Sequence, residues 1–251
     1  MQKGRNIVIV GATSAIAEHC ARLWLRQGNV ARMSLIGRDR TRVEQLAADL
    51  RVRGPDVALQ VLSGDLGDPA DIRRMVNESE AGHPADIVLI AHGSLPQQAD
   101  CQRDLAAARD AIQVNAISPV LFAEAFIETM EHRNAGTLGI IGSVAGDRGR
   151  KSNYVYGAAK GLVTRYAQGL QHRLAGTRAK VVLVKPGPTE TPMTAHLKAR
   201  GAKLADVSAV AQTIVRGMEQ GRPVVYAPAR WALIMMVIRH LPRFVFNRMD
   251  I

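Results

Sequence analysis

The stretch NIVIVGATSAIAEH (residues 6–19) passes from an apolar run, through a turn that contains one glycine, into a helical pattern. NIVIV is typical of a strand buried on both faces of a parallel sheet, because it is almost entirely apolar. Gly11 stands where a phosphate-binding turn makes its tight bend, and Ala15 and Ala17 replace the second and third glycines of such a turn. Alanine is an accepted substitute at the last position. The stretch predicts a strand, a turn and a helix, and by itself leaves cofactor binding open.

The composition fits one folded domain. The chain has 251 residues, of which 47% are hydrophobic and 22% charged, so it can bury a large core. Cys20 and Cys101 lie far apart, which predicts neither a disulfide nor a metal site and favours a reducing compartment. Strand-like sequence begins near the N-terminus without an export leader, so we expect a cytoplasmic protein.

The charge balance favours anionic partners. The formal net charge is +11, from 33 Lys and Arg against 22 Asp and Glu. Phosphate ligands, an anionic membrane surface and nucleic acid all suit such a balance. Aromatic residues make up only 4% and are not interleaved with basic residues, so we expect no nucleic-acid partner.

Short apolar runs alternate with longer helical patterns along the chain. Seven crossover-connected strands of this kind predict an α/β fold, with a single Rossmann-like, doubly wound parallel sheet and helices on both faces. We assign residues 1–228 to this domain and residues 229–251 to a C-terminal extension of the same domain. The expected strands lie within 6–12, 32–38, 57–65, 85–93, 136–146, 179–187 and 223–228, and amphipathic helices within 41–53, 71–81, 106–132 and 156–175.

The stretch SVAGDRGRKSNYVYGAAKG (residues 143–161) carries the chemistry. Tyr156 and Lys160 are four residues apart and share a helix face. An ammonium group beside a phenol favours the phenolate, so we expect Lys160 to lower the pKa of Tyr156 and tune it for acid–base work. Ser143, at the end of a predicted strand, is placed to polarise a carbonyl group. Tyr154 lacks a lysine four residues on and is expected to line the substrate pocket.

Together these residues resemble the short-chain dehydrogenase/reductase family over essentially the whole chain. The resemblance implies that Tyr156 donates a proton to the carbonyl oxygen, Ser143 positions the substrate, and Lys160 grips the nicotinamide ribose. It also implies that Asn115 holds a water in the proton relay, that Asp65 meets the adenine and that Thr191 lies near the carboxamide. The catalytic residues implied are Ser143, Tyr156, Lys160 and Asn115.

The resemblance also implies a set of cofactor-binding residues at the carboxyl ends of the strands. The sequence departs from the family pattern at the thinned glycine turn and at IAHGS (residues 90–94), where Ala91 and His92 replace polar asparagine. We interpret His92 as a structural loop residue. The set is Gly11, Thr13, Ser14, Ala15, Ile16, Gly37, Arg38, Asp65, Leu66, Ala91, His92, Gly93, Tyr156, Lys160, Pro186, Gly187, Thr189 and Thr191.

The end of the second expected strand bears on the choice of cofactor. An acidic residue there selects NAD by binding the ribose 2′-hydroxyl. The strand instead ends in Gly37 and Arg38, and an arginine binds a 2′-phosphate through charge-assisted hydrogen bonds. We favour NADP, while Asp39, the next residue, leaves NAD as an alternative.

The C-terminal extension is both apolar and basic. Residues 231–238 form an unbroken apolar run, followed by arginines interleaved with Leu241, Phe244, Val245 and Phe246. The run is too short to span a bilayer, which needs about 20 residues. It suits an element in the lipid headgroup region, on the inner face of the cell membrane, or a lid over a lipid substrate. The alternative is a subunit interface in a homodimer or homotetramer.

The C-terminal extension and several stretches before it resemble the decaprenylphosphoryl-2-keto-ribose reductases. These stretches are NYVYGAAKG, PMTAHLK, YAPAR and MMVIRHLPR. That resemblance implies reduction of the 2-keto group of a polyprenyl-phosphoryl pentose, the second step of a ribose-to-arabinose epimerisation in cell-wall biosynthesis. A flavin-dependent oxidase would be the partner that makes the keto intermediate. The alternatives are a soluble ketone or 3-oxoacyl reductase and a non-catalytic dinucleotide-binding scaffold or sensor.

Overall fold

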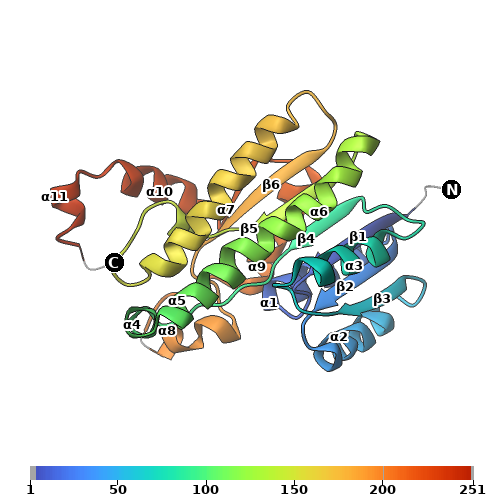
Figure 1. Ribbon diagram of the computed structural model, residues 1–251, viewed down its shortest axis with the longest axis horizontal. Coiled ribbons are helices and arrows are strands. Elements are labelled where there is room, and N and C mark those ends of the chain that lie inside the picture. Colours follow the sequence, from blue (N-terminus) through green and yellow to red (C-terminus); the bar gives the residue numbers. More distant parts are fainter. Residues whose placement is uncertain (1–3, 200, 250–251) are drawn as a thin grey trace.

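A seven-stranded sheet, all of whose neighbouring strands are parallel, forms the centre of the computed structural model (Figure 1). The model describes residues 4–199 and 201–249. The strand order is β3-β2-β1-β4-β5-β6-β7, the doubly wound arrangement that the alternating runs predict. The strands are β1 (Arg5–Val10), β2 (Val30–Gly37), β3 (Ala58–Ser63), β4 (Ile87–Ile90), β5 (Thr137–Ile141), β6 (Lys180–Pro186) and β7 (Val224–Ala227).

The crevice for a ligand lies where the winding reverses, between β1 and β4. From β1 the chain winds outward through β2 to β3, and from β4 it winds the other way to β7. Val10, the last residue of β1, pairs with Ile36 on one side and with Ile90 on the other. Ligands of open parallel sheets bind beyond the carboxyl ends of strands at such a reversal. The turn after Val10 and the loop after Ile90 therefore face the same crevice.

Helices cover both faces of the sheet and enclose a separate apolar cluster on each. One face packs against α3 (Pro69–Glu80), α6 (Ser118–Arg133) and α7 (Tyr154–Arg173), and its cluster includes Phe122 and Phe126. The other packs against α1 (Ala15–Arg26), α2 (Arg40–Arg53) and α9 (Val207–Glu219), with Trp24 fully buried. Burial of β1 and β4 between these layers explains why their sequences are continuously apolar.

Aspartate side chains cap several of these helices. Asp39, Asp68 and Asp206 each accept a hydrogen bond from the backbone N–H three residues on, at the starts of α2, α3 and α9. Such caps satisfy one of the N–H groups that the first turn of a helix leaves free. For α2 and α3 the caps fix the helix start a few residues after β2 and β3, so these two loops at the crevice are short.

The predicted helix at 106–132 is interrupted in the structure. It consists of α5 (Leu105–Ile112), a π-helical turn at Gln113–Ile117 and α6. Pro119 has no N–H and cannot donate the usual hydrogen bond to the carbonyl four residues earlier, that of Asn115. The Ser118 N–H instead bonds to the Gln113 carbonyl, five residues back. Single π-helical turns of this kind occur frequently at functional sites.

In the described part of the chain, the run Leu105–Arg133 alone has the length and apolar composition needed to cross a bilayer. In its most apolar window, 56% of the residues are buried inside the protein. Core helices pass the same test, and α6 packs its apolar side chains on the sheet.

The remaining short helices lie at the C-terminal part of the chain and beside the crevice. They are α4 (Gln98–Arg103), η2 (Val144–Gly146), η3 (Pro192–Thr194), α8 (Ala195–Ala199), α10 (Arg230–His240) and α11 (Arg243–Phe246). Figure 1 shows α10 and α11 projecting from one end of the molecule, away from the sheet. The grouping of residues 1–228 and 229–251 as one domain stays a prediction.

Candidate active site

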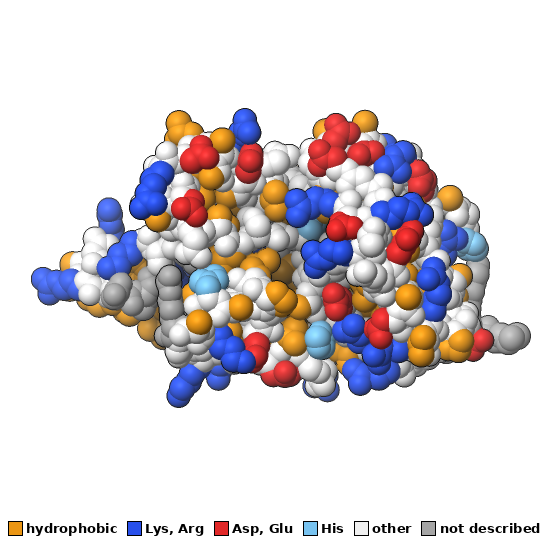
Figure 2. All heavy atoms as spheres, turned by 90° about the horizontal axis from the view of Figure 1, so that it is seen from below, with side chains coloured by type: hydrophobic (Ala, Val, Ile, Leu, Met, Phe, Trp, Pro, Cys, Tyr) orange, Lys and Arg blue, Asp and Glu red, His pale blue; other side chains and the backbone are white. Residues whose placement is uncertain are grey.

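Two adjoining cavities open at the carboxyl ends of the strands. The larger has a volume of about 610 Å³ and the smaller about 160 Å³. Both walls include Ser14, Ile16, His92, Gly93 and Thr191. Figure 2 shows Lys and Arg side chains spread over one face of the protein, with several beside a central hollow.

All of the residues implied for catalysis and cofactor binding line one cavity or both, although their roles stay predictions. Those in the larger cavity alone are Gly11, Thr13, Ala15, Gly37, Arg38, Asp65 and Leu66. Those in the smaller cavity alone are Ala91, Asn115, Ser143, Tyr156, Lys160, Pro186, Gly187 and Thr189.

The turn after β1 requires glycine at Gly11 for two reasons. Its φ is +74°, in the left-handed region, and a Cβ there would lie 2.5 Å from the His92 backbone nitrogen. Ala15 begins α1, and Ala17 is fully buried, so the methyl groups in place of two glycines still permit close packing of the helix on the sheet. Ser14 occupies the N-cap position of α1, and its side chain makes no capping bond.

The end of β2 presents arginines to the larger cavity. Arg38 and Arg42 both line it, whereas the Arg40 guanidinium pairs with Glu44 at 2.8 Å. Asp39 also lines the cavity, but its Oδ1 accepts from the Arg42 backbone N–H at 3.1 Å. Sequence reasoning missed Arg42, which lies in the first turn of α2.

The His92 side chain links the loop after β4, through Ser118 at the start of α6, to Leu66 on the loop after β3. Ser118 Oγ donates to the Leu66 carbonyl, so the bond of 2.7 Å between Ser118 Oγ and His92 Nε2 has the imidazole as donor. Burial, with the charges of Lys160 and Arg38, lowers the pKa of His92 to about 3. The ring is neutral at physiological pH, which agrees with a structural loop residue.

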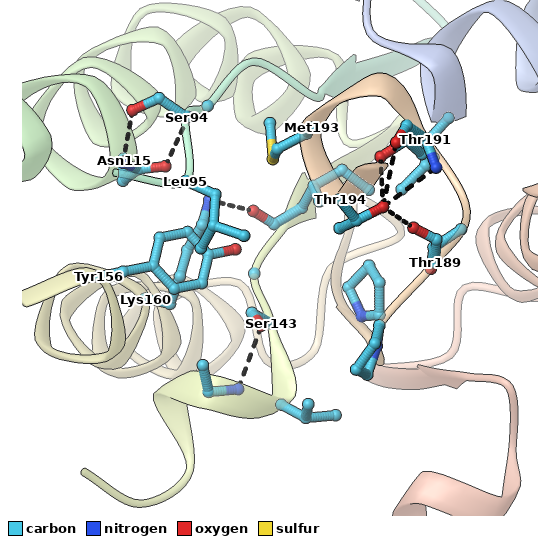
Figure 3. Close-up of a pocket in the computed structure, with 18 of the residues that line it drawn as sticks. Ser94, Leu95, Asn115, Ser143, Tyr156, Lys160, Thr189, Thr191, Met193 and Thr194 are labelled. Carbon is cyan, nitrogen blue, oxygen red and sulfur yellow. Dashed lines mark hydrogen bonds between the residues drawn. The ribbon is translucent and has the colours of Figure 1, made fainter. Parts of the chain in front are cut away.

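Asn115, in the π-helical turn, holds the loop after β4. Its side chain is fully buried. Oδ1 accepts from the Ser94 backbone N–H at 3.0 Å and Nδ2 donates to Ser94 Oγ (Figure 3). Nδ2 also donates to the Ala111 carbonyl. A Cβ at Gly93 would lie 2.9 Å from Asn115 Oδ1, so this loop passes close to the amide. The amide thus positions the Gly93–Ser94 backbone, and a role in a water relay stays a prediction.

Ser143 and Tyr156 meet at the wall of the smaller cavity (Figure 3). Ser143 directly follows the β5 region and accepts from the Ala145 N–H at 3.1 Å, which begins the η2 turn. Burial raises the pKa of the Tyr156 phenol above its ordinary value, and a hydrogen bond with Ser143 offsets part of the rise. Tyr156 is therefore protonated at neutral pH and able to donate a proton.

The expectation that the pKa of Tyr156 lies below its ordinary value is wrong for this arrangement, because burial raises it. Lys160 Nζ lies 5.8 Å from the centroid of the Tyr156 ring and donates to the Ile141 carbonyl at 3.0 Å. Desolvation of the phenol therefore outweighs the distant ammonium charge. Burial also lowers the pKa of Lys160 itself, to about 8. Tyr154 was likewise misplaced: it is 45% exposed and is not among the residues lining either cavity.

Two features of the smaller cavity were not anticipated. Arg150 and Asn153, on the loop before α7, line it. Behind the cavity, buried Asp147 accepts hydrogen bonds from Lys185 Nζ and from the Tyr226 hydroxyl, which joins the η2 loop to β6 and β7. The Thr194 hydroxyl bonds the loop of Thr189 and Thr191 into shape (Figure 3). The Thr194 contacts are local, whereas no sequence spacing pairs Asp147 with Lys185 and Tyr226, because segments far apart along the chain bring them together.

The larger cavity fits a dinucleotide. It joins a tight glycine turn and the free N-terminus of α1, which suit a pyrophosphate, to Asp65 and Arg38 at the ends of two other strands. It also connects directly to the cavity that holds Ser143 and Tyr156. Among the described residues no group of three or more His, Cys, Asp or Glu could hold a metal ion.

Comparisons with known proteins agree with this arrangement. The family model for short chain dehydrogenase matches residues 5–201. An uncharacterized oxidoreductase of Streptomyces coelicolor is 31% identical over 252 residues, covering 98% of this chain and 96% of the relative. One from Mycobacterium tuberculosis is 32% identical over 246 residues, covering 97% and 96%. A short-chain dehydrogenase from Burkholderia cenocepacia, solved in complex with NADP, superposes with a TM-score of 0.82 at 19% identity, covering 99% of this chain and 98% of that one.

Proposed function

The chain belongs to the short-chain dehydrogenase/reductase family of oxidoreductases, and from this premise we propose that it reduces a ketone to a secondary alcohol with NADPH. The observation that carries the proposal is the placement of Ser143, Tyr156 and Lys160 around one small cavity that adjoins a dinucleotide-sized one. A dinucleotide, when bound, supplies the hydride.

The side chains supply the acid and the orientation. The protonated phenol of Tyr156 donates its proton to the carbonyl oxygen as that oxygen gains negative charge. Ser143, at the wall of the same cavity as Tyr156, polarises the same oxygen. Lys160, anchored on the Ile141 carbonyl, provides positive charge behind the phenol, which stabilises the phenolate left after proton donation.

Two arginines at the end of β2 support NADP over NAD. Arg38 and Arg42 both line the cavity at the end of β2, where a ribose 2′-phosphate would lie. Asp39, the residue that would favour NAD, is engaged in capping α2. Arg40 is paired with Glu44, so it does not compete for the phosphate. The relative from Burkholderia cenocepacia was solved with NADP, which agrees with this preference.

For the substrate we propose a polyprenyl-phosphoryl 2-keto-pentose, made by a flavin-dependent oxidase. The net charge of +11 suits a phosphorylated ligand. A cavity of about 150 Å³ holds one six-atom ring, so the cavity of about 160 Å³ around Tyr156 suits a single sugar ring and leaves a lipid chain outside.

The α10–α11 segment supports contact with a membrane surface on the cytoplasmic side. Met235 is the one residue of α10 that is buried, while Leu233 is 64% exposed and Phe244, on α11, 69% exposed. The segment also carries Arg230, Arg239, Arg243 and Arg248. Exposed apolar groups flanked by cations suit the boundary between anionic headgroups and acyl chains. A subunit interface is the competing use of the same surface.

A soluble ketone reductase is the second candidate, and the small volume of the catalytic cavity favours it. Purified protein should be assayed for NADPH and NADH oxidation with membrane extract containing the keto-lipid, and with a small water-soluble ketone. The proposal expects oxidation of NADPH that depends on the keto-lipid and falls when residues 231–251 are removed. If the protein is as active on the small ketone as on the keto-lipid, and the truncation does not change this activity, the soluble ketone reductase is the better account.

A further inference from the structure

We propose that Arg150 and Asn153 form a subsite for a phosphorylated, hydroxyl-bearing ligand at the edge of the catalytic cavity, with Arg150 binding the phosphoryl oxygens and Asn153 a sugar hydroxyl. The inference rests on the proposed function and names the group that selects its substrate. Both residues line the cavity of Ser143 and Tyr156 and lie in one turn, in which the Asn153 N–H donates to the Arg150 carbonyl at 3.2 Å.

Arg150 carries hydrogen-bonding capacity that the protein does not use. In the described part of the chain its Nε is buried without a partner, and its NH2 group meets only the Met235 sulfur, at 3.5 Å. A thioether is a weak acceptor, and burial of the guanidinium lowers its pKa from the ordinary value. A half-buried cation so poorly paired is unfavourable, and an anionic ligand would offset that cost.

The neighbouring charges do not satisfy Arg150. Asp147 is the nearest acidic influence, yet its two carboxylate oxygens are taken by Lys185 and Tyr226. The described residues that line the cavity include no acidic side chain, but they include two basic ones, Lys160 and Arg150. Arg148, two residues earlier, is different: it donates to the Ile238 and Leu241 carbonyls and stacks on Phe246, so it fastens the C-terminal helices.

Asn153 supplies the second part of the subsite. It occupies the N-cap position of α7, but its side chain makes no capping bond. Its Oδ1 is buried and has no hydrogen-bond partner among the described residues. An unpaired buried acceptor is unfavourable, and a sugar hydroxyl is a donor that would satisfy it.

The position of Arg150 matches the order of groups in a phosphoryl-linked substrate. From the wall of the catalytic cavity, Arg150 reaches the Met235 sulfur on α10. The exposed apolar side chains of α10, such as Leu233, lie on the same helix. A keto-sugar at Tyr156 and a phosphoryl group at Arg150 would therefore occupy neighbouring sites, with α10 beside the second of them.

Calorimetric binding to the full-length protein, with NADP⁺ present, tests the subsite without turnover. The probes are ribose, ribose 1-phosphate and farnesyl-phosphoryl ribose. We expect wild-type protein to bind at least one phosphoryl probe tenfold or more tightly than ribose. Arg150→Met should abolish this ratio, Arg150→Lys should retain part of it, and Asn153→Ala should weaken all three probes while keeping the ratio. Arg165→Met, which removes an exposed arginine of α7 bonded to Gln168, is the matched control and should keep the wild-type ratio.

The outcomes separate the sources of the phosphoryl group and the two proposals. If the two phosphoryl probes bind equally tightly, the subsite recognises a free sugar phosphate. If only the farnesyl probe binds tightly, the subsite recognises a lipid-linked sugar phosphate. A ratio unchanged in folded Arg150→Met, confirmed by its melting temperature, overturns the subsite. An Arg150-dependent ratio together with no NADPH oxidation on the keto-lipid would support the subsite and overturn the proposed reaction.

Discussion

Trp231, at the start of α10, lies against Gly187 on the loop after β6: a Cβ on Gly187 would fall 1.9 Å from Trp231 Nε1. Gly187 lines the catalytic cavity, so the C-terminal extension is packed directly behind it. Arg148 fastens the far end of the extension through the Ile238 and Leu241 carbonyls. Together with the contact of Arg150 with Met235, these interactions attach the extension to the catalytic loops, while most of its apolar side chains stay exposed.

Gly187→Ala tests this attachment. The added methyl group cannot share the space with the Trp231 ring, so we expect overpacking to cost about 1–3 kcal/mol. A protein of this size then loses roughly 3–10 °C in melting temperature. Gly169→Ala, where a Cβ meets open space, is the control and should not lower the melting temperature. If Trp231→Ala does not restore the stability of Gly187→Ala, the contact does not explain the loss.

Arg38→Ala and Arg42→Ala test the cofactor preference. Removing a charge-assisted hydrogen bond costs roughly 1.5–3 kcal/mol, so KM for NADPH should rise about 10- to 100-fold in each. KM for NADH, which lacks the 2′-phosphate, should change little. Arg40→Ala, whose guanidinium pairs with Glu44, serves as the control. Equal effects on both cofactors would show that these arginines do not read the phosphate.

The pH dependence of kcat/KM should follow Lys160. Burial lowers the pKa of its ammonium to about 8, so the group loses its charge as pH rises through that value. The pKa of Tyr156 is raised, so the phenol remains a proton donor over the same range. We expect kcat/KM for ketone reduction to fall above pH of about 8 in initial-rate measurements. A profile that stays flat to pH of about 9.5 would contradict this assignment.

Acid sensitivity of the fold should depend on His92. The pKa of His92 is about 3 in the folded protein against an ordinary 6.5, so only the unfolded chain takes up the proton between these values. Stability therefore falls as pH drops through this window. His92→Gln removes the titrating group, and its melting temperature should fall less than that of wild type between pH of about 7.5 and 4.5. Equal decreases in both proteins would exclude His92 as the cause.

Much of the fold followed from local sequence. Continuous apolar runs predicted strands buried on both faces, and Gly11, Ser143, Tyr156 and Lys160 were predicted at strand ends or on a shared helix face. The helical spacing did not predict the π-helical turn at Gln113–Ile117, in which the Ser118 N–H bonds to the Gln113 carbonyl immediately before Pro119. The pKa of Tyr156 depends on burial, which a spacing of four residues does not measure.

The rest of the site depends on contacts between distant strands. Asp147, Lys185 and Tyr226 come together only when β6 and β7 are placed beside the η2 loop. The unpaired groups of Arg150 and Asn153 are likewise features of burial. An arginine in a chain rich in arginine gives no signal of this kind by itself.

The most direct test of the account is Tyr156→Phe. The substitution removes the phenolic proton donor and keeps the ring, so we predict a loss of roughly 10²–10⁴-fold in ketone-dependent NADPH oxidation. NADPH binding, followed by fluorescence titration, should stay within a few-fold of wild type. Turnover that survives in a variant with unchanged NADPH binding would contradict proton donation by Tyr156 and with it the proposed reaction.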